Sequence, residues 1–198
     1  MATYPPQTAA EVMEFLVAGN KRFLAGMSED ARINLERRQA VVEAQHPFAV
    51  ILCCSDSRVP PEIIFSKRIG DLFVVRNAGN VLGDVTLGSI EYAVEHLGVP
   101  LVLVLGHEKC GAVTAAVKSG EAPGHVNSVV QKIRPIVERV QGRPGDPVAN
   151  AVDANILEVV AQLKASAPSL APRVQSGQLT IMGYRYNLST GTVTQVAD

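Results

Sequence analysis

Cysteine and tryptophan are scarce in this chain of 198 residues, which contains three cysteines and no tryptophan. An odd and sparse set of cysteines excludes the disulfide frameworks that stabilise small secreted proteins. Two of the cysteines, Cys53 and Cys54, are adjacent, and the third is Cys110. All three are therefore expected to be free for thiolate chemistry in a reducing compartment.

An excess of one charge and a long apolar run are also missing. The chain has 18 basic and 19 acidic residues, a formal net charge of −1. This balance gives no general electrostatic field for nucleic acid or an anionic membrane. The most apolar segment, residues 99–106, is far shorter than the roughly 20 residues of a membrane-spanning helix. The first residues lack a signal-peptide pattern. We expect a cytoplasmic protein that binds neither nucleic acid nor membranes.

The composition predicts an ordinary globular domain, because 47% of the residues are hydrophobic and 19% are charged. A length of 198 residues corresponds to about one domain. We expect a single domain over residues 1–198. It would comprise an N-terminal helical arm (1–45), a core with the candidate site (46–120), and C-terminal helices and strands (121–198).

The spacing of apolar residues predicts an alternation of strands and helices. Helical periodicity is found in six segments: 8–25, 32–45, 86–97, 110–119, 126–140 and 148–165. Strands are predicted in five segments: 48–54, 71–76, 99–106, 179–186 and 192–196. Strand, helix and strand in succession favour a right-handed crossover and parallel pairing. The predicted fold class is therefore α/β, with a central, mainly parallel β-sheet of four to five strands flanked by helices.

Reactive side chains stand at the carboxyl ends of two predicted strands, where open α/β sheets place their functional sites. Cys54 ends one strand and is followed by Asp56 and Arg58. His107 ends another and is followed by Cys110, so both can lie on one side of a first helical turn. If these strands are neighbours, two thiols and an imidazole converge. Three such ligands with an open fourth position are typical of catalytic zinc.

Each of these features also has a structural interpretation. The His-x-x-Cys pattern alone is weak, because a histidine can be a core residue and cysteines are often simply buried. Asp56 and Arg58 can form a local ion pair that stabilises the turn at residues 58–61. Cys53 and Cys54 point to opposite faces of an extended strand, so Cys53 is expected to be a small core residue.

The order of these motifs resembles that of the β-class carbonic anhydrases. CSDSR at residues 54–58 and GHEKCG at residues 106–111 match the family patterns CxDSR and HxxC. The resemblance is dense over about residues 40–118, through PPEIIF, GDLFVVRNAGN, LGSIEYAV and VPLVLVLGH, and looser elsewhere, including GNKRF. It implies one Zn²⁺ per subunit and interconversion of CO2 and bicarbonate. It also implies a homodimer or a dimer of dimers, with N-terminal helices reaching over a partner subunit.

The resemblance assigns roles to the motif residues. Cys54, His107 and Cys110 match the zinc ligands, and Asp56 and Arg58 match the catalytic dyad. Zinc supplies hydroxide near neutral pH, and a carboxylate held by Arg58 would orient that zinc-bound hydroxide toward CO2. Asp56 is also a possible fourth ligand, in a closed and inactive state at lower pH.

Further positions match the substrate pocket of one subgroup of the family. Gln45 corresponds to a glutamine that contacts substrate across the dimer interface. Phe73, Ala78 and Tyr92 correspond to an apolar wall, which suits CO2. Gly111 corresponds to a glycine whose backbone approaches the substrate. Without the resemblance, Phe73 and Tyr92 would be read as core residues and Gly111 as the start of a helix.

Another subgroup has a non-catalytic bicarbonate site made of a Trp, an Arg and a Tyr. Arg76 and Tyr186 stand at two of these positions, but the tryptophan position is Ile51. We therefore expect Arg76 to make a structural hydrogen bond or ion pair near the sheet.

Two other functions use the same residues. One is hydrolysis of carbonyl sulfide or carbon disulfide, which relatives of the family perform with the same three ligands. The other is a non-catalytic zinc-binding domain used for assembly, whose metal would have no exchangeable water.

Overall fold

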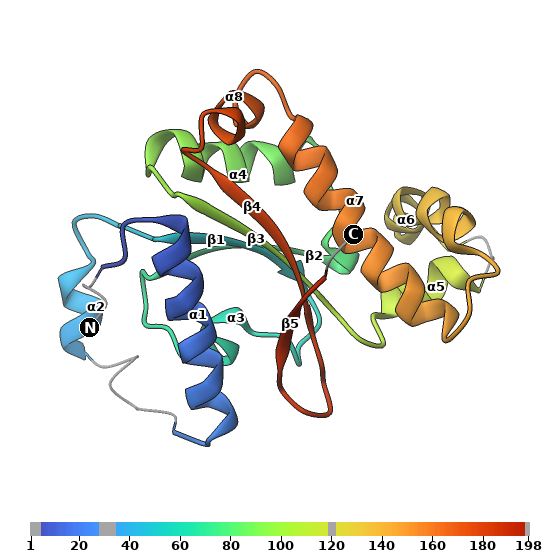
Figure 1. Ribbon diagram of the computed structural model, residues 1–198, viewed down its shortest axis with the longest axis horizontal. Coiled ribbons are helices and arrows are strands. Elements are labelled where there is room, and N and C mark those ends of the chain that lie inside the picture. Colours follow the sequence, from blue (N-terminus) through green and yellow to red (C-terminus); the bar gives the residue numbers. More distant parts are fainter. Residues whose placement is uncertain (1–4, 28–34, 119–121, 197–198) are drawn as a thin grey trace.

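The computed structural model describes residues 5–27, 35–118 and 122–196, and it shows one sheet with helices on both faces (Figure 1). The strands are β1 (Ala49–Cys54), β2 (Leu72–Asn77), β3 (Leu101–His107), β4 (Thr180–Tyr186) and β5 (Val193–Gln195). Their order is β2-β1-β3-β4-β5, with the first four parallel and β5 antiparallel to β4. The predicted fold class is confirmed, and all five predicted strands are present.

The helices of the described residues include one in each of the six predicted segments and two short ones that were not predicted. They are α1 (Ala9–Leu24), α2 (Leu35–Ala40), α3 (Pro61–Ile64), α4 (Asp84–His96), α5 (Gly111–Val117), α6 (Val126–Val140), α7 (Pro147–Ala165) and α8 (Leu170–Gln175), with a 3₁₀ turn η2 (Ala78–Asn80). The helix predicted over 32–45 ends earlier, at Ala40, because none of the α2 residues is buried. Residues 32–34 of that prediction, and residue 119, lie outside the described residues.

The sheet separates two apolar cores, and the alternation of side chains along β1 assigns its residues to them. Val50, Leu52 and Cys54 belong to the core that α4 to α8 cover. Ile51 and Cys53 belong to the core that α1 and α3 cover. Cys53 is completely buried, which confirms that it is a core residue on the face opposite to Cys54.

The N-terminal helix α1 packs on the sheet of its own chain. It starts with a capping box in which Thr8 Oγ1 accepts from the Glu11 N–H (3.3 Å) and Glu11 Oε2 accepts from the Thr8 N–H (3.0 Å). Val12 and Leu16 are fully buried against the sheet. The apolar face of α1 is thus covered within one chain. That the N-terminal arm reaches over a partner subunit stays a prediction, which concerns the outer face of α1 and the helix α2.

The order of the strands creates a switch point beside β1. The chain passes from β1 to β2 on one side and then returns to β3 on the other side of β1. In open α/β sheets the crevice at such a reversal, at the carboxyl ends of the strands, is the usual binding site. Cys54 and His107 are the last residues of β1 and β3, so both stand at this crevice.

Two glycines let α7 lie directly on the sheet behind the crevice. A Cβ at Gly106 would come within 2.5 Å of the Ile156 side chain, and one at Gly183 would approach the same side chain equally closely. The helix therefore holds β3 immediately before His107.

Among the helices of the described residues, each is too short or too polar to cross a lipid bilayer.

Candidate metal centre

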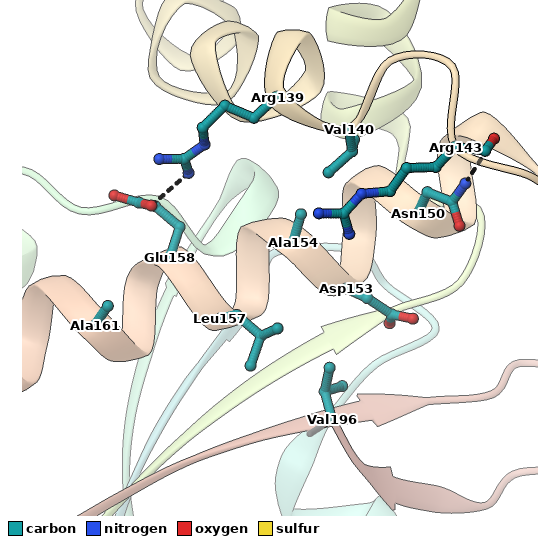
Figure 2. Close-up of a pocket in the computed structure, with 10 residues that line it drawn as sticks. All are labelled: Arg139, Val140, Arg143, Asn150, Asp153, Ala154, Leu157, Glu158, Ala161 and Val196. Atoms are coloured by element: carbon teal, nitrogen blue, oxygen red, sulfur yellow. Dashed lines mark hydrogen bonds and ion pairs between the residues drawn. The ribbon is translucent and has the colours of Figure 1, made fainter. Parts of the chain in front are cut away.

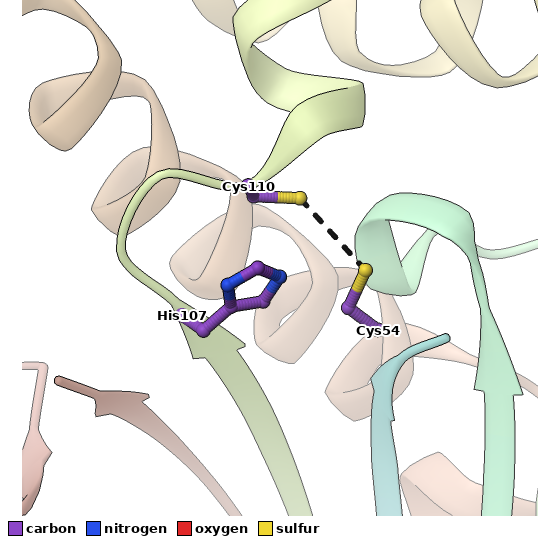
Figure 3. A group of neighbouring side chains, drawn as sticks. All are labelled: Cys54, His107 and Cys110. Atoms are coloured by element: carbon purple, nitrogen blue, oxygen red, sulfur yellow. Dashed lines mark hydrogen bonds between the residues drawn. The ribbon is translucent and has the colours of Figure 1, made fainter. Parts of the chain in front are cut away.

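Three soft or borderline metal ligands converge at the switch point (Figure 3). Cys54 comes from β1, His107 from β3, and Cys110 from the turn that precedes α5. Their candidate ligand atoms all lie within 4.8 Å of one another, and the two Sγ atoms are 3.9 Å apart. The three side chains are buried, so the convergence predicted from the sequence is present in the fold.

The residues fit zinc. Two Zn–S bonds of about 2.3 Å at a tetrahedral angle separate the sulfurs by about 3.8 Å, close to the separation found here. His107 Nε2 is buried and has no hydrogen-bond partner among the described residues. His107 Nδ1 lies 2.8 Å from the Glu108 carbonyl oxygen, and donation there fixes the tautomer that leaves Nε2 free for a metal.

The surroundings of the two thiols favour a thiolate at Cys54. Its hydrogen bond with Cys110 is the main reason that the pKa of Cys54 lies well below that of an ordinary thiol. The Gly79 N–H also points at Cys54 Sγ, 3.4 Å away. The same Cys54 interaction and burial raise the pKa of Cys110. Burial raises the pKa of Cys53, in the other core, to about 12.

The acidic and basic residues of the motif form a forked ion pair at the rim of the cluster. Arg58 Nε donates to Asp56 Oδ1 (2.9 Å) and Nη2 donates to Oδ2 (2.7 Å). The Arg58 backbone N–H donates to Oδ1 as well (3.0 Å). These bonds hold the pKa of Asp56 well below its usual range. Asp56 Oδ2 is 3.8 Å from His107 Nε2, so an ionised carboxylate stands beside the cluster.

Arg76 holds the backbone of this loop. Its Nε and Nη2 donate to the Cys54 carbonyl (3.1 and 2.9 Å), and Nη2 also donates to the Asp56 carbonyl (2.7 Å). The structural hydrogen bonds expected for Arg76 are thus confirmed. Ile51 stands at the tryptophan position of the bicarbonate subsite and is fully buried in the core that α1 and α3 cover. Tyr186 is buried in the same core.

Two of the predicted pocket residues flank the cluster. Ala78 follows Asn77, the residue that pairs with Cys54 in the sheet. Gly111 follows Cys110 and begins α5. Both positions are exposed, so they border the mouth of the site.

The other predicted pocket residues lie away from the cluster of their own chain. The rings of Phe73 and Tyr92 are 6.2 Å apart, but Phe73 is four residues, about 13 Å, along β2 from Asn77. Gln45 precedes β1 and is exposed, and it lines a hollow of about 590 Å³ together with Tyr92. Because β1 spans about 20 Å, one chain does not bring Gln45 to its own cysteines.

One contact at the cluster was not foreseen from the sequence, namely the N–H of Gly79 on Cys54 Sγ. The only sign of it in the sequence is a glycine just after a predicted strand, where the backbone needs a positive φ. Gly79 has φ 74°.

Another hollow, of about 610 Å³, lies between α6 and α7 near Val196 (Figure 2). Three of its charged residues form ion pairs, since Arg139 binds Glu158 and Asp153 binds Arg185 (2.7 Å). Within the part of the chain that the structure describes, no cysteine or histidine lines it. The chemistry of the molecule is therefore concentrated at the metal cluster rather than in this hollow.

Comparison with known proteins agrees with the site. The carbonic anhydrase family model matches residues 49–193. The carbonic anhydrase of Mycolicibacterium smegmatis is 39% identical over 193 residues, covering 96% of this chain and 94% of its own length. Carbonic anhydrase 2 of Mycobacterium tuberculosis is 42% identical over 180 residues, covering 89% and 87%.

Solved structures give the same result at the level of the fold. The Coccomyxa β-carbonic anhydrase superposes with a TM-score of 0.76 at 27% identity, covering 92% of this chain and 85% of that chain. A β-carbonic anhydrase of Aspergillus fumigatus gives 0.73 at 30% identity, covering 94% and 92%. With its Cys-His-Cys cluster at the switch point of a parallel sheet, this chain belongs to the β-class carbonic anhydrase family.

Proposed function

We propose that this protein catalyses the zinc-dependent, reversible hydration of CO2 to bicarbonate and a proton. The observation that supports this most directly is the convergence of Cys54, His107 and Cys110 beside the Asp56–Arg58 pair. The membership of the carbonic anhydrase family agrees with it.

Cys54, His107 and Cys110 would hold one Zn²⁺ per subunit. Zinc bound there would lower the pKa of a coordinated water and so supply hydroxide near neutral pH. Two thiolates offset the charge of the ion, so this site has less positive charge with which to acidify water than a three-histidine site. The remaining acceleration of CO2 hydration must therefore come from neighbouring residues that orient the hydroxide.

Asp56 is the residue that can provide this orientation. Its carboxylate is ionised and held at both oxygens by Arg58, so it can accept a hydrogen bond from the attacking hydroxide. That bond would direct a lone pair toward CO2. Because Asp56 Oδ2 is only 3.8 Å from His107 Nε2, the same side chain could instead become the fourth ligand when its pair with Arg58 breaks.

The substrate pocket would be completed by a second subunit in a homodimer, or in a dimer of dimers. Ala78 and Gly111 border the mouth of the site, whereas Gln45, Phe73 and Tyr92 lie elsewhere in the same chain. Gln45 and Tyr92 are exposed and Phe73 is half-buried beside Tyr92, a position that suits presentation to a partner's site. An apolar wall with one amide fits CO2, which has no strong polar group. The cytoplasmic location remains a prediction.

The test is metal analysis combined with stopped-flow CO2 hydration across pH. We expect one zinc per chain and rapid hydration in the purified protein. Cys54→Ser should lose both. Asp56→Ala should keep zinc and lose about 10²-fold in rate, the order of loss expected when a reacting group is no longer held in position. Zinc-loaded protein without hydration at any pH would overturn the proposal.

The two alternative functions are separated by the same preparation. A carbonyl sulfide or carbon disulfide hydrolase would turn over those gases faster than CO2, so the rates should be compared directly. A non-catalytic assembly domain would hold zinc and hydrate nothing. The relatives described above are named as carbonic anhydrases, which favours hydration.

A further inference from the structure

The hydrogen bond from the Gly79 N–H to Cys54 Sγ (3.4 Å) reaches the candidate metal centre from outside the ligand set. It comes from the backbone of the η2 turn, which follows the edge strand β2. A backbone N–H has no side-chain rotamers, so the direction of this N–H is set by the contacts that fix the turn. Whatever holds Gly79 therefore also holds this bond.

Asn155 holds the turn from the far side. Its Nδ2 donates to the Gly79 carbonyl oxygen at 3.0 Å, although the two residues are 76 positions apart. Asn155 is 2% exposed and lies on the buried face of α7, among apolar residues. Burying an amide is costly unless it is hydrogen-bonded, so this side chain has a specific partner rather than a general packing role.

The packing around Gly79 leaves the turn little freedom. A Cβ at this position would lie 2.9 Å from Ile133 Cδ1 of α6 and 3.0 Å from Ala112 Cβ of α5. Ala112 follows Cys110 by two residues, so the same contact connects the turn to the second thiol. Three helices thus enclose Gly79, and Asn155 supplies a hydrogen bond between one of them and the turn.

An N–H bond to a thiolate draws electron density from the sulfur and reduces its donation to a metal. In a site with two thiolates, this bond keeps the ion more acidic. We propose that Asn155 is a positioning residue of the metal centre, which fixes the Gly79 turn so that its N–H stays on Cys54 Sγ. This inference rests on the proposed function, because it assumes that the three ligands hold a metal.

The test uses Co²⁺ in place of zinc and the sulfur-to-cobalt charge-transfer absorption as its readout. Asn155→Leu keeps the volume and removes the donor, and Asn155→Ser keeps a small polar group that is too short to reach Gly79. The matched control is Asn20→Leu. Asn20 is also buried, and its Nδ2 donates to the Ile64 and Gly191 carbonyls on the opposite face of the sheet.

We expect the charge-transfer band to move to longer wavelength in both Asn155 variants, because the sulfur becomes a stronger donor. The kcat for CO2 hydration should fall about tenfold, the low end for residues that support a metal ligand, with KM little changed. Asn20→Leu should lose stability and keep both the band and kcat. Wild-type bands in the two Asn155 variants, together with lower denaturation midpoints, would reduce Asn155 to a structural residue.

A measurement on the unmodified chain covers the case in which both Asn155 variants fail to fold. In protein loaded with ¹¹³Cd, the N–H···S bond should give scalar coupling between the metal and the Gly79 amide proton. Absence of this coupling would overturn the inference. Failure of wild-type protein to bind cobalt or to hydrate CO2 would instead refute the proposed function itself.

Discussion

Arg58 differs from an ordinary surface cation in having three donors on one carboxylate. Its Nε, its Nη2 and its backbone N–H all contact Asp56. A lysine at the same place offers a single ammonium group and cannot reproduce the planar fork. The orientation of Asp56 therefore depends on the shape of the guanidinium as well as on its charge.

We expect Arg58→Lys to recover little of the rate that Arg58→Gln loses. Arg58→Gln should lower kcat/KM for CO2 about tenfold; the loss is modest because Arg58 is 54% exposed and water screens the pair. The zinc content should stay unchanged, since the hydrogen bonds of Arg58 go to Asp56 and not to Cys54, His107 or Cys110. Stopped-flow hydration with metal analysis measures both. A fully active Arg58→Lys would show that charge alone suffices.

At this scale the sequence predicted the motif residues but not their supporting contacts. His107 and Cys110 could be placed together because they are three positions apart where a strand was expected to end and a helix to begin. Gly79 and Asn155 could not, because their bond joins residues 76 positions apart and depends on how α7 packs. No periodicity or motif reports such a contact before the fold is known.

The attachment of α1 to the core includes a buried lysine that is bonded to no carboxylate among the described residues. Lys67 is 3% exposed, its Nζ donates to the Phe15 carbonyl (2.7 Å), and it lies 3.2 Å from the centre of the Phe15 ring. Burial lowers the pKa of Lys67 to about 7, and the charge of Arg22 adds to this effect. An unfolded lysine titrates near 10.4. Between about pH 7 and 10 the unfolded chain therefore binds more protons than the folded one.

The free energy of unfolding should accordingly gain a rising contribution from Lys67 as the pH increases from 7 to 10. Below pH 7 the folded protein bears the full cost of burying the Lys67 charge. Above pH 7 this cost is relieved by at most about 1.4 kcal/mol for each pH unit. Urea denaturation of wild type and Lys67→Met at several pH values isolates this contribution. Parallel pH profiles for the two proteins would contradict the expectation.

The contact of α7 with β3 and β4 is close enough to show coupling between two substitutions. Gly106→Ala should cost about 1–3 kcal/mol, because its methyl group would overlap the Ile156 side chain. Ile156→Ala should cost about 2–5 kcal/mol by opening a cavity. The double variant should lose clearly less than the sum, since the new methyl occupies part of that cavity. Additive losses in denaturant unfolding would contradict the packing described.

The elements that the sequence did not predict are short. α3, η2 and α8 have four, three and six residues, too few for a helical period to be recognised. α2 was predicted too long because the apolar residues of 32–45 suggested a helical face, whereas none of the six residues of α2 is buried. Long amphipathic segments such as α6, by contrast, have the bounds that their periodicity predicts.

The separation of Gln45 from the cysteines of its own chain gives a test for the whole assembly. Gln45→Ala should lower kcat/KM while the zinc ligands of the same chain stay intact. A chain with Cys54→Ser lacks a metal site but still presents Gln45. If the glutamine acts across the interface, mixed dimers of the two variants should regain activity that neither homodimer has.

Sedimentation must show that the two variants form dimers, and a tag on one chain isolates the mixed species. No recovery in verified mixed dimers would place the action of Gln45 elsewhere. A monomer in sedimentation with normal CO2 turnover would contradict the need for a second subunit altogether.

Cys53 and Cys54 are consecutive in β1, but their side chains point to opposite faces of the sheet, and this makes the two thiols chemically unequal. Cys54 faces a hydrogen-bonded cluster with a second sulfur 3.9 Å away, while Cys53 is fully buried in the opposite core, where burial raises the pKa of its thiol to about 12. A small oxidant or alkylating reagent that enters the metal-free protein therefore meets one reactive face. Damage, and chemical labelling, should concentrate on Cys54 and Cys110 and spare the residue next to them in the chain.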